Sequence, residues 1–77
     1  MVSAYILIQT EVGKAAQVTD QVRSIEGITV VDPVTGPYDI VARAEAADLD
    51  LLAKGTVMPM QDLDGITRTL TCPVVHL

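Results

Sequence analysis

The four residues Glu26-Gly27-Ile28-Thr29 recur, with aspartate in place of glutamate, as Asp64-Gly65-Ile66-Thr67. Each copy follows a stretch in which apolar residues recur at helical spacing, and each begins a stretch rich in β-branched residues. Both copies are therefore predicted to join a helix to a strand. Glycine suits such a junction because it adopts left-handed backbone angles without a steric penalty. The two copies stand 38 residues apart, which divides the chain into two similar halves.

The remaining elements follow from the spacing of apolar residues. Residues 3–9 are apolar on both alternating sets, which is typical of a central strand covered on both faces. From Lys14 onward the apolar residues have helical spacing, and this predicted helix ends at Gly27. Further strands are expected over residues 28–34, 38–45 and 66–72. Pro33 indicates an edge position or a bulge for the first of these three.

A second helix is expected to begin after Asp48, because aspartate is a good N-cap residue. Gly55 weakens this helix by about 1 kcal/mol relative to alanine. Pro59 lacks the N–H group that a helix interior requires, and its ring clashes with the preceding turn. We therefore expect an interrupted helix that ends before Gly65.

The order β-α-β-β-α-β predicts one α+β domain over residues 1–77, with a ferredoxin-like antiparallel sheet in the strand order 4-1-3-2. Right-handed crossovers place both helices on one face of the sheet. We expect the other face to carry Tyr5, Leu7, Val41 and the threonine row of the last strand, a surface too apolar to remain in water. An obligate homodimer of the dimeric α+β barrel type is therefore predicted. The predicted dimer-interface residues are Tyr5, Leu7, Val41 and Thr71.

The length and composition of the chain also favour self-association. A domain of 77 residues buries only about 60–65% of the surface that its unfolded chain exposes, so small domains rely on disulfides, metals or association. Cys72 is the only cysteine and His76 the only histidine, which excludes an internal disulfide, a cysteine-based zinc site and a His-pair metal site. We expect no metal and no cofactor, so self-association is the remaining means of stabilising this small domain.

Charge and hydropathy exclude two classes of partner. Ten acidic and five basic side chains give a net charge of −5, and the basic residues are scattered singly, so direct nucleic-acid binding is not expected. No run approaches the roughly 18–20 apolar residues that a membrane span needs. The N-terminal stretch lacks the basic region of a signal peptide. A cytoplasmic protein is the resulting expectation.

The segment Thr35-Gly36-Pro37-Tyr38-Asp39 resembles the Gly-X-Tyr-Asp signature of the effector-binding domain of Lrp/AsnC regulators. The helix-to-strand junction at Gly27, the approach Leu63-Asp64-Gly65-Ile66 and the closing Thr67-X-Thr69 row are similar to the pattern of that family, so the resemblance covers essentially the whole chain. Family members carry an N-terminal helix-turn-helix, whereas here the first strand follows Met1 almost at once. The sequence therefore resembles a stand-alone effector module. Its interrupted second helix departs from the family pattern at the far wall of the expected pocket.

The resemblance implies dimers formed through the sheets, often assembled to octamers or decamers, with small effectors, typically amino acids, bound between dimers. It also implies action alone or by mixing with full-length regulators. The implied ligand-binding residues are Gly36, Pro37, Tyr38, Asp39, Thr67 and Thr69. In that site Asp39 would accept hydrogen bonds from an α-ammonium group, and Gly36 would allow close approach of the backbone. Tyr38 would form an apolar wall, the threonines would supply neutral hydrogen bonds, and Pro37 would stiffen the turn.

Other interpretations of the same residues remain open. Asp39 could brace the turn, Tyr38 could be an interface or core aromatic residue, and the threonine row could reflect β-propensity alone. For the whole protein, the alternatives are a structural assembly module and a small cofactor-independent monooxygenase or isomerase of the dimeric α+β barrel type. Such an enzyme needs an enclosed cavity with a positioned acid or base. His76 is expected at the surface or an interface, and no catalytic residue is assigned.

Overall fold

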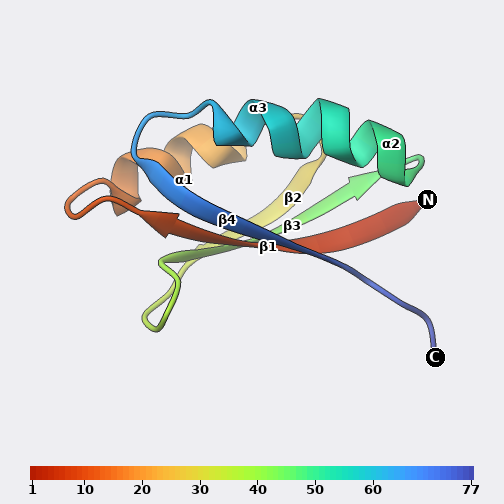
Figure 1. The fold of residues 1–77 in the computed structure, drawn as a ribbon, viewed down its shortest axis with the longest axis horizontal. Coiled ribbons are helices and arrows are strands. Elements are labelled where there is room, and N and C mark those ends of the chain that lie inside the picture. Colours follow the sequence, from red (N-terminus) through yellow and green to blue (C-terminus); the bar gives the residue numbers. More distant parts are fainter.

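The computed structural model describes residues 1–77 and confirms the predicted order of elements (Figure 1). The elements are β1 (Val2–Thr10), α1 (Ala15–Arg23), β2 (Ile28–Pro33), β3 (Ile40–Ala46), α2 (Leu49–Leu52), the π-helical turn η1 (Ala53–Val57), α3 (Met58–Gln61) and β4 (Ile66–Pro73). The strands form one antiparallel sheet in the order β2-β3-β1-β4, as predicted. The fold is therefore the ferredoxin-like α+β fold, and β2, which contains Pro33, is an edge strand.

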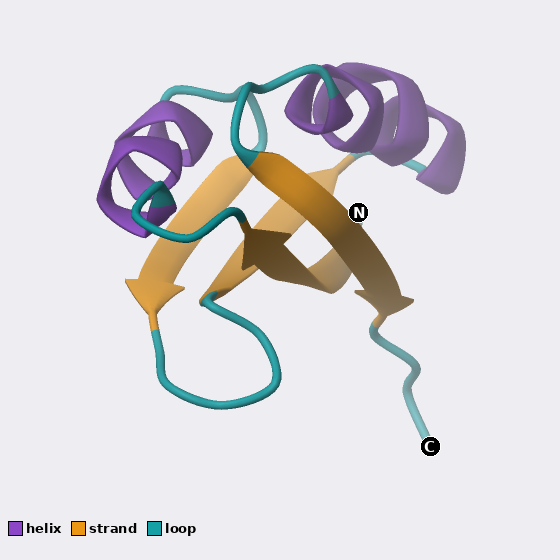
Figure 2. Cartoon of the chain, turned by 60° about the vertical axis from the view of Figure 1, so that its left-hand side comes forward, coloured by secondary structure: helices purple, strands orange, loops and turns teal.

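The helices lie on one face of the sheet, and the opposite face has no cover from the chain (Figures 1 and 2). Alternate residues of the central strands point toward the helices, because successive side chains of a strand point to opposite faces. The fully buried side chains of this core are Ala4, Ile6, Ile8, Val18, Val22, Ile40, Ala42, Ala44 and Met60. The prediction that β1 is central is confirmed, but its own chain covers only one of its two faces.

The two Gly-Ile-Thr junctions are structurally equivalent. Gly27 and Gly65 both have left-handed backbone angles, with φ of 92° and 97°. The carbonyl oxygen of Gly27 accepts a hydrogen bond from the Glu45 amide at 2.8 Å, and that of Gly65 accepts one from the Glu11 amide at 2.8 Å. Each junction is thus tied to the end of the neighbouring central strand. The first helix ends earlier than predicted, at Arg23, and does not continue to Gly27.

The second helical segment is interrupted, as predicted, but the chain follows a helical path throughout. The Asp48 side chain caps its start by accepting a hydrogen bond from the Leu51 amide at 2.8 Å. The π-helical turn η1 precedes Pro59, which has no N–H to donate to the carbonyl of Gly55. A wider turn at this point accommodates the proline ring without ending the helix. None of the helices has the length and hydrophobicity that crossing a membrane would require.

The faces of β4 are the reverse of those expected from the sequence. Thr71 lies opposite Ile6 and Thr69 opposite Ile8, so both point to the side that the helices cover. The prediction that the threonine row and Thr71 belong to the open face is therefore wrong. The residues of β4 on the open face are Arg68, Leu70 and Cys72. The physical reason is that β4 is an edge strand with incomplete helical cover, where threonine is tolerated inside and an arginine must reach water.

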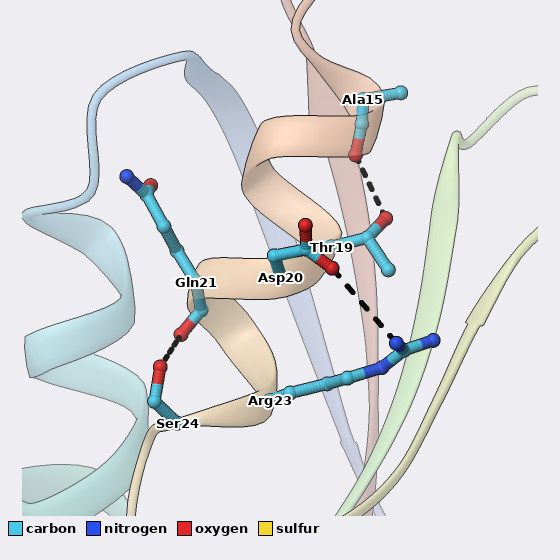
Figure 3. A network of polar contacts seen from close by, with 6 residues as sticks. All are labelled: Ala15, Thr19, Asp20, Gln21, Arg23 and Ser24. Atoms are coloured by element: carbon cyan, nitrogen blue, oxygen red, sulfur yellow. Dashed lines mark hydrogen bonds and ion pairs between the residues drawn. The ribbon is translucent and has the colours of Figure 1, made fainter.

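Local hydrogen bonds satisfy polar groups within α1 and at its C-terminal end (Figure 3). The buried Thr19 hydroxyl donates to the carbonyl of Ala15 at 2.7 Å, which satisfies a polar group inside the core. The Ser24 hydroxyl donates to the carbonyl of Gln21 at 2.9 Å, one of the carbonyls left free at the helix end. These contacts are local, and the position of α1 depends on its buried valines.

The close approach of the two halves at Gly27 gives a testable prediction. A Cβ atom there would lie 2.6 Å from the Thr56 hydroxyl oxygen, which donates to the carbonyl of Glu26 at 2.8 Å. Gly27→Ala must adopt left-handed angles, which costs about 1–2 kcal/mol, and must also displace this hydrogen bond. Gly13→Ala is the matched control, because Gly13 has a φ of 83° and no atom within 4 Å of the added group.

We expect Gly27→Ala to lower the free energy of unfolding by about 1 kcal/mol more than Gly13→Ala does. Urea unfolding of both variants at one fixed protein concentration measures the difference. Equal losses would show that Thr56 does not constrain the junction.

Candidate functional site

The loop that joins β2 to β3 is fastened at its base to the end of β1. The Val34 amide donates to the carbonyl of Asp39 at 2.9 Å, and the Asp39 amide donates to the carbonyl of Ile8 at 2.9 Å. These two bonds close the loop and place Asp39 beside the last residues of β1. The outer residues of the loop, 35–38, take part in neither of these bonds.

The Asp39 carboxylate strengthens this attachment. Its Oδ2 atom accepts hydrogen bonds from the Thr10 amide at 2.8 Å and from the Thr10 hydroxyl at 3.2 Å. The side chain is half-buried, and its Oδ1 atom makes no hydrogen bond within the chain. Asp39 therefore braces the loop, as one of the two interpretations of the sequence had it, and it keeps one oxygen that can accept a further hydrogen bond.

The outer part of the loop is exposed. Gly36 has a φ of 149°, and no atom lies within 4 Å of the position that a Cβ would occupy. Pro37 is exposed, and Tyr38 is half-buried without a hydrogen bond from its hydroxyl. The backbone at Gly36 is thus open to another molecule.

The predicted threonines lie on the other side of the end of β1. The Thr67 hydroxyl donates to the carbonyl of Gln9 at 3.2 Å, at a bulge in the pairing of β1 with β4. The Thr69 hydroxyl accepts a hydrogen bond from the side-chain amide of Gln61 at 3.3 Å. Both threonines line a surface hollow of about 230 Å³ together with Gln61. This hollow is open, and most of its lining is polar.

The structure brings all six predicted ligand-binding residues to one end of the sheet without enclosing a site between them. Asp39 is attached to Thr10, and Thr67 to Gln9, so the loop and the threonines flank the last two residues of β1. No hollow in the chain is lined by both groups. A single chain therefore presents two parts of a surface and no pocket that joins them.

The open face of the sheet is the second candidate site. Tyr5 is 44% exposed, and its hydroxyl accepts a hydrogen bond from Arg43 Nη1 at 2.7 Å, with the guanidinium carbon 5.0 Å from the ring centroid. Leu7 and Val41 lie opposite each other on this face and are half-buried. Three of the four predicted interface residues thus share the open face, and the fourth, Thr71, does not.

Leu70, Cys72 and Arg43 are among the residues of this face that the sequence did not indicate. Leu70 is 41% exposed and lies opposite Leu7, and the exposed Cys72 lies opposite Tyr5. Arg43 lies in the strand predicted over residues 38–45, but its contact with Tyr5 joins residues 38 positions apart. The alternation of side chains along β4 correctly separates Leu70 and Cys72 from the threonines. It does not indicate which set faces the helices.

The sequence that forms this geometry matches a known family over nearly its whole length. The Lrp/AsnC ligand binding domain matches residues 3–76. This chain belongs to the Lrp/AsnC ligand-binding domain family. The resemblance to this family predicted from the sequence is therefore confirmed.

Some relatives of this Lrp/AsnC domain are transcription regulators. An uncharacterised HTH-type transcriptional regulator of Pyrococcus abyssi is 32% identical over 68 residues, which are 88% of this chain and 43% of that protein. The chain thus spans less than half the length of that curated relative. A solved protein of Thermus thermophilus has a TM-score of 0.92 and 26% identity, covering 100% of this chain and 96% of its own.

A transcriptional regulator of Neisseria meningitidis, solved as a complex with L-Met, shares the fold with a TM-score of 0.71 and 18% identity. The alignment covers 97% of this chain and 50% of that chain. At this identity the comparison establishes the fold alone.

The attachment of Asp39 to Thr10 can be tested through stability. Asp39→Ala removes the acceptor of two hydrogen bonds at a half-buried position, and hydrogen bonds to charged groups contribute about 1.5–3 kcal/mol. Asp39→Asn is the matched control, because its amide oxygen still accepts from the Thr10 amide. We expect chemical unfolding to show a loss of about 2 kcal/mol for Asp39→Ala and less than half of that for Asp39→Asn. Identical losses would mean that charge, and not the hydrogen bond, holds the loop.

Proposed function

We propose that this Lrp/AsnC domain is a non-enzymatic module that binds a small amino-acid effector and assembles into oligomers. The observation that carries the proposal is the pair of open surfaces at the end of β1. One surface is the Gly36–Asp39 loop, and the other contains Thr67 and Thr69. Neither is a pocket by itself. Each is placed to form one wall of a site whose other walls come from a neighbouring copy.

The groups on these surfaces suit an α-amino acid. The Oδ1 atom of Asp39 has no partner in the chain and is available to accept a hydrogen bond from an ammonium group, while Oδ2 keeps the loop in place. The exposed backbone at Gly36 allows a ligand to approach closely. Tyr38 and Pro37 supply apolar contact, and the threonine hydroxyls supply neutral hydrogen bonds. The complex of the Neisseria meningitidis regulator with L-Met supports an amino acid as the ligand class.

Assembly uses the open face of the sheet in this proposal. Tyr5, Leu7 and Val41, together with Leu70 and Cys72, form an apolar surface on an otherwise complete small domain. Packing two such faces together removes this surface from water and gives each copy a second core layer. We infer a homodimer, with dimers combining into an octamer or a decamer that completes the effector sites.

The domain acts in the cytoplasm in this proposal, either alone or by association with full-length regulators of its family. The relative from Pyrococcus abyssi supports this view, because it is an HTH-type transcriptional regulator of which the matched region is 43%. A module with the same sheet face can form mixed dimers with such a regulator and change how it assembles. The domain itself carries a net charge of −5, which disfavours direct contact with nucleic acid.

A screen of the twenty amino acids tests the ligand proposal. A bound amino acid at about 100 times its dissociation constant adds about 2.7 kcal/mol of stability, which raises the unfolding temperature by several degrees. Calorimetry then measures the affinity of any ligand found for the wild type and for Asp39→Asn. We expect the variant, which keeps the loop fastened, to bind about 10- to 100-fold more weakly because it lacks the carboxylate charge. The absence of binding across the whole set would refute the effector proposal.

Substitution on the open face tests the assembly proposal. Leu70→Asp places a charge in the centre of the proposed interface, and Leu49→Asp makes the same change on α2, where Leu49 is 56% exposed on the helical side. Light scattering after size exclusion is expected to show a monomer for Leu70→Asp and the wild-type oligomer for Leu49→Asp. An unchanged oligomer for Leu70→Asp would show that the open face is not the interface.

A further inference from the structure

The ion pairs of the chain leave two of its five basic side chains without an acidic partner. The paired residues are Lys14 with Asp64 at 3.8 Å, Arg23 with Asp20 at 3.9 Å, and Lys54 with Asp50 at 3.3 Å. The two remaining residues, Arg43 and Arg68, both lie on the open face of the sheet. The Arg43 guanidinium lies over the ring of Tyr5 and donates a hydrogen bond to its hydroxyl. Arg68 makes no side-chain hydrogen bond or ion pair within the chain.

The open face has opposite charges on its two edges. Arg68 is on β4, opposite Gln9 of β1, and Asp32 is on β2, opposite Val41 of β3. These strands are the two edges of the sheet, about three strand spacings or roughly 14 Å apart, so the two side chains do not meet within one chain. The other acidic residue of this face, Glu45, lies on a central strand near its far end.

Two-fold symmetry limits how a second copy can cover this face. In a closed dimer the same patch is used on both copies, and the symmetry axis lies between the two sheets. If the axis runs parallel to the strands, β2 of one copy lies over β4 of the other. If the axis runs across the strands, β2 lies over β2 and β4 over β4. Both arrangements use the same patch of each copy, and they place different charged residues opposite each other.

Electrostatics selects between the two arrangements. An axis parallel to the strands places Asp32 near Arg68 of the partner subunit, and symmetry creates this contact twice. An axis across the strands reverses their direction, so Arg68, which lies at the level of Gln9 near the end of β1, is placed over the Pro73 end of β4 of the partner subunit and gains no acidic partner there. Through the register, Arg68 and Asp32 lie two residues apart along the direction of β1, or about 7 Å. The long arginine side chain can bridge this offset between sheets that pack about 10 Å apart.

We propose that two reciprocal Arg68–Asp32 ion pairs between two copies of this chain fix the orientation of the sheet-to-sheet dimer, with its two-fold axis parallel to the strands. This inference rests on the proposed assembly through the open face. It adds which edges meet and which residues determine that choice. The partner is a second copy of this chain.

Two single charge reversals test the proposal in one mixture. In a homodimer of Arg68→Glu both contacts become acid against acid, and in a homodimer of Asp32→Lys both become base against base. In a mixed dimer of these two variants, both contacts again join opposite charges. We expect each variant alone to dimerise about tenfold more weakly than the wild type, and the mixture to form heterodimers with an affinity close to that of the wild type.

Native mass spectrometry of the mixed variants, one of them labelled with ¹⁵N, counts the species. Random pairing gives about half heterodimer, and a tenfold weakening of both homodimers raises that share to about nine-tenths. Arg23→Glu and Asp62→Lys are the controls, because they make the same charge changes at exposed positions on the helical side. Their mixture is expected to remain close to random.

A random distribution for the Arg68→Glu and Asp32→Lys mixture would overturn the proposal, and so would a tighter homodimer of either single variant. Both substituted side chains are exposed and make no bond within the chain, so circular dichroism should show unchanged folding. The Leu70→Asp experiment separates the two levels of inference. If Leu70→Asp is monomeric while the charge variants pair at random, the open face is the interface but these ion pairs do not orient it.

Discussion

The pairing of β1 with β3 on one side and with β4 on the other fixes the position of each functional group in this domain. The buried residues of β1 form the centre of the core, while Tyr5 and Leu7 form the centre of the open face. The end of the same strand holds Asp39 through Thr10 and Thr67 through Gln9. One strand therefore supports the core, the proposed interface and both parts of the proposed effector site.

The repeated junction sequence explains how the helical layer is fixed on this sheet. Gly65, at the end of the second helical segment, packs against Lys14 and Val18 of the first half, and a Cβ atom placed on it would lie 3.1 Å from each side chain. Gly27, at the end of the first helix, packs against Thr56 of the second half. Each glycine thus makes room for the helical segment of the opposite half. The π-helical turn brings Thr56 to this contact, where its hydroxyl has a backbone partner.

Those parts of the structure that depend on local sequence could be predicted. The left-handed glycines, the cap at Asp48 and the edge position of Pro33 each follow from a residue and its close neighbours, and the strand order follows from the order of the elements along the chain. The faces of β4 could not be predicted, because one alternating set of this edge strand consists of threonines and the other combines Arg68 with apolar residues. The register with β1 decides between them. The anchor of Asp39 was also beyond sequence patterns, since it joins residues 29 positions apart.

The attachment of Asp39 to the strand that also forms the open face has a thermodynamic consequence for the proposed assembly. If effector sites are completed only between copies, ligand binding and subunit association are linked equilibria and must affect each other to the same extent. The apparent affinity for the effector then rises with protein concentration, and the degree of assembly rises with effector concentration. The degree of assembly of such a domain depends on the concentration of its ligand and on its own concentration. The association of whole subunits is the only movement that this response requires.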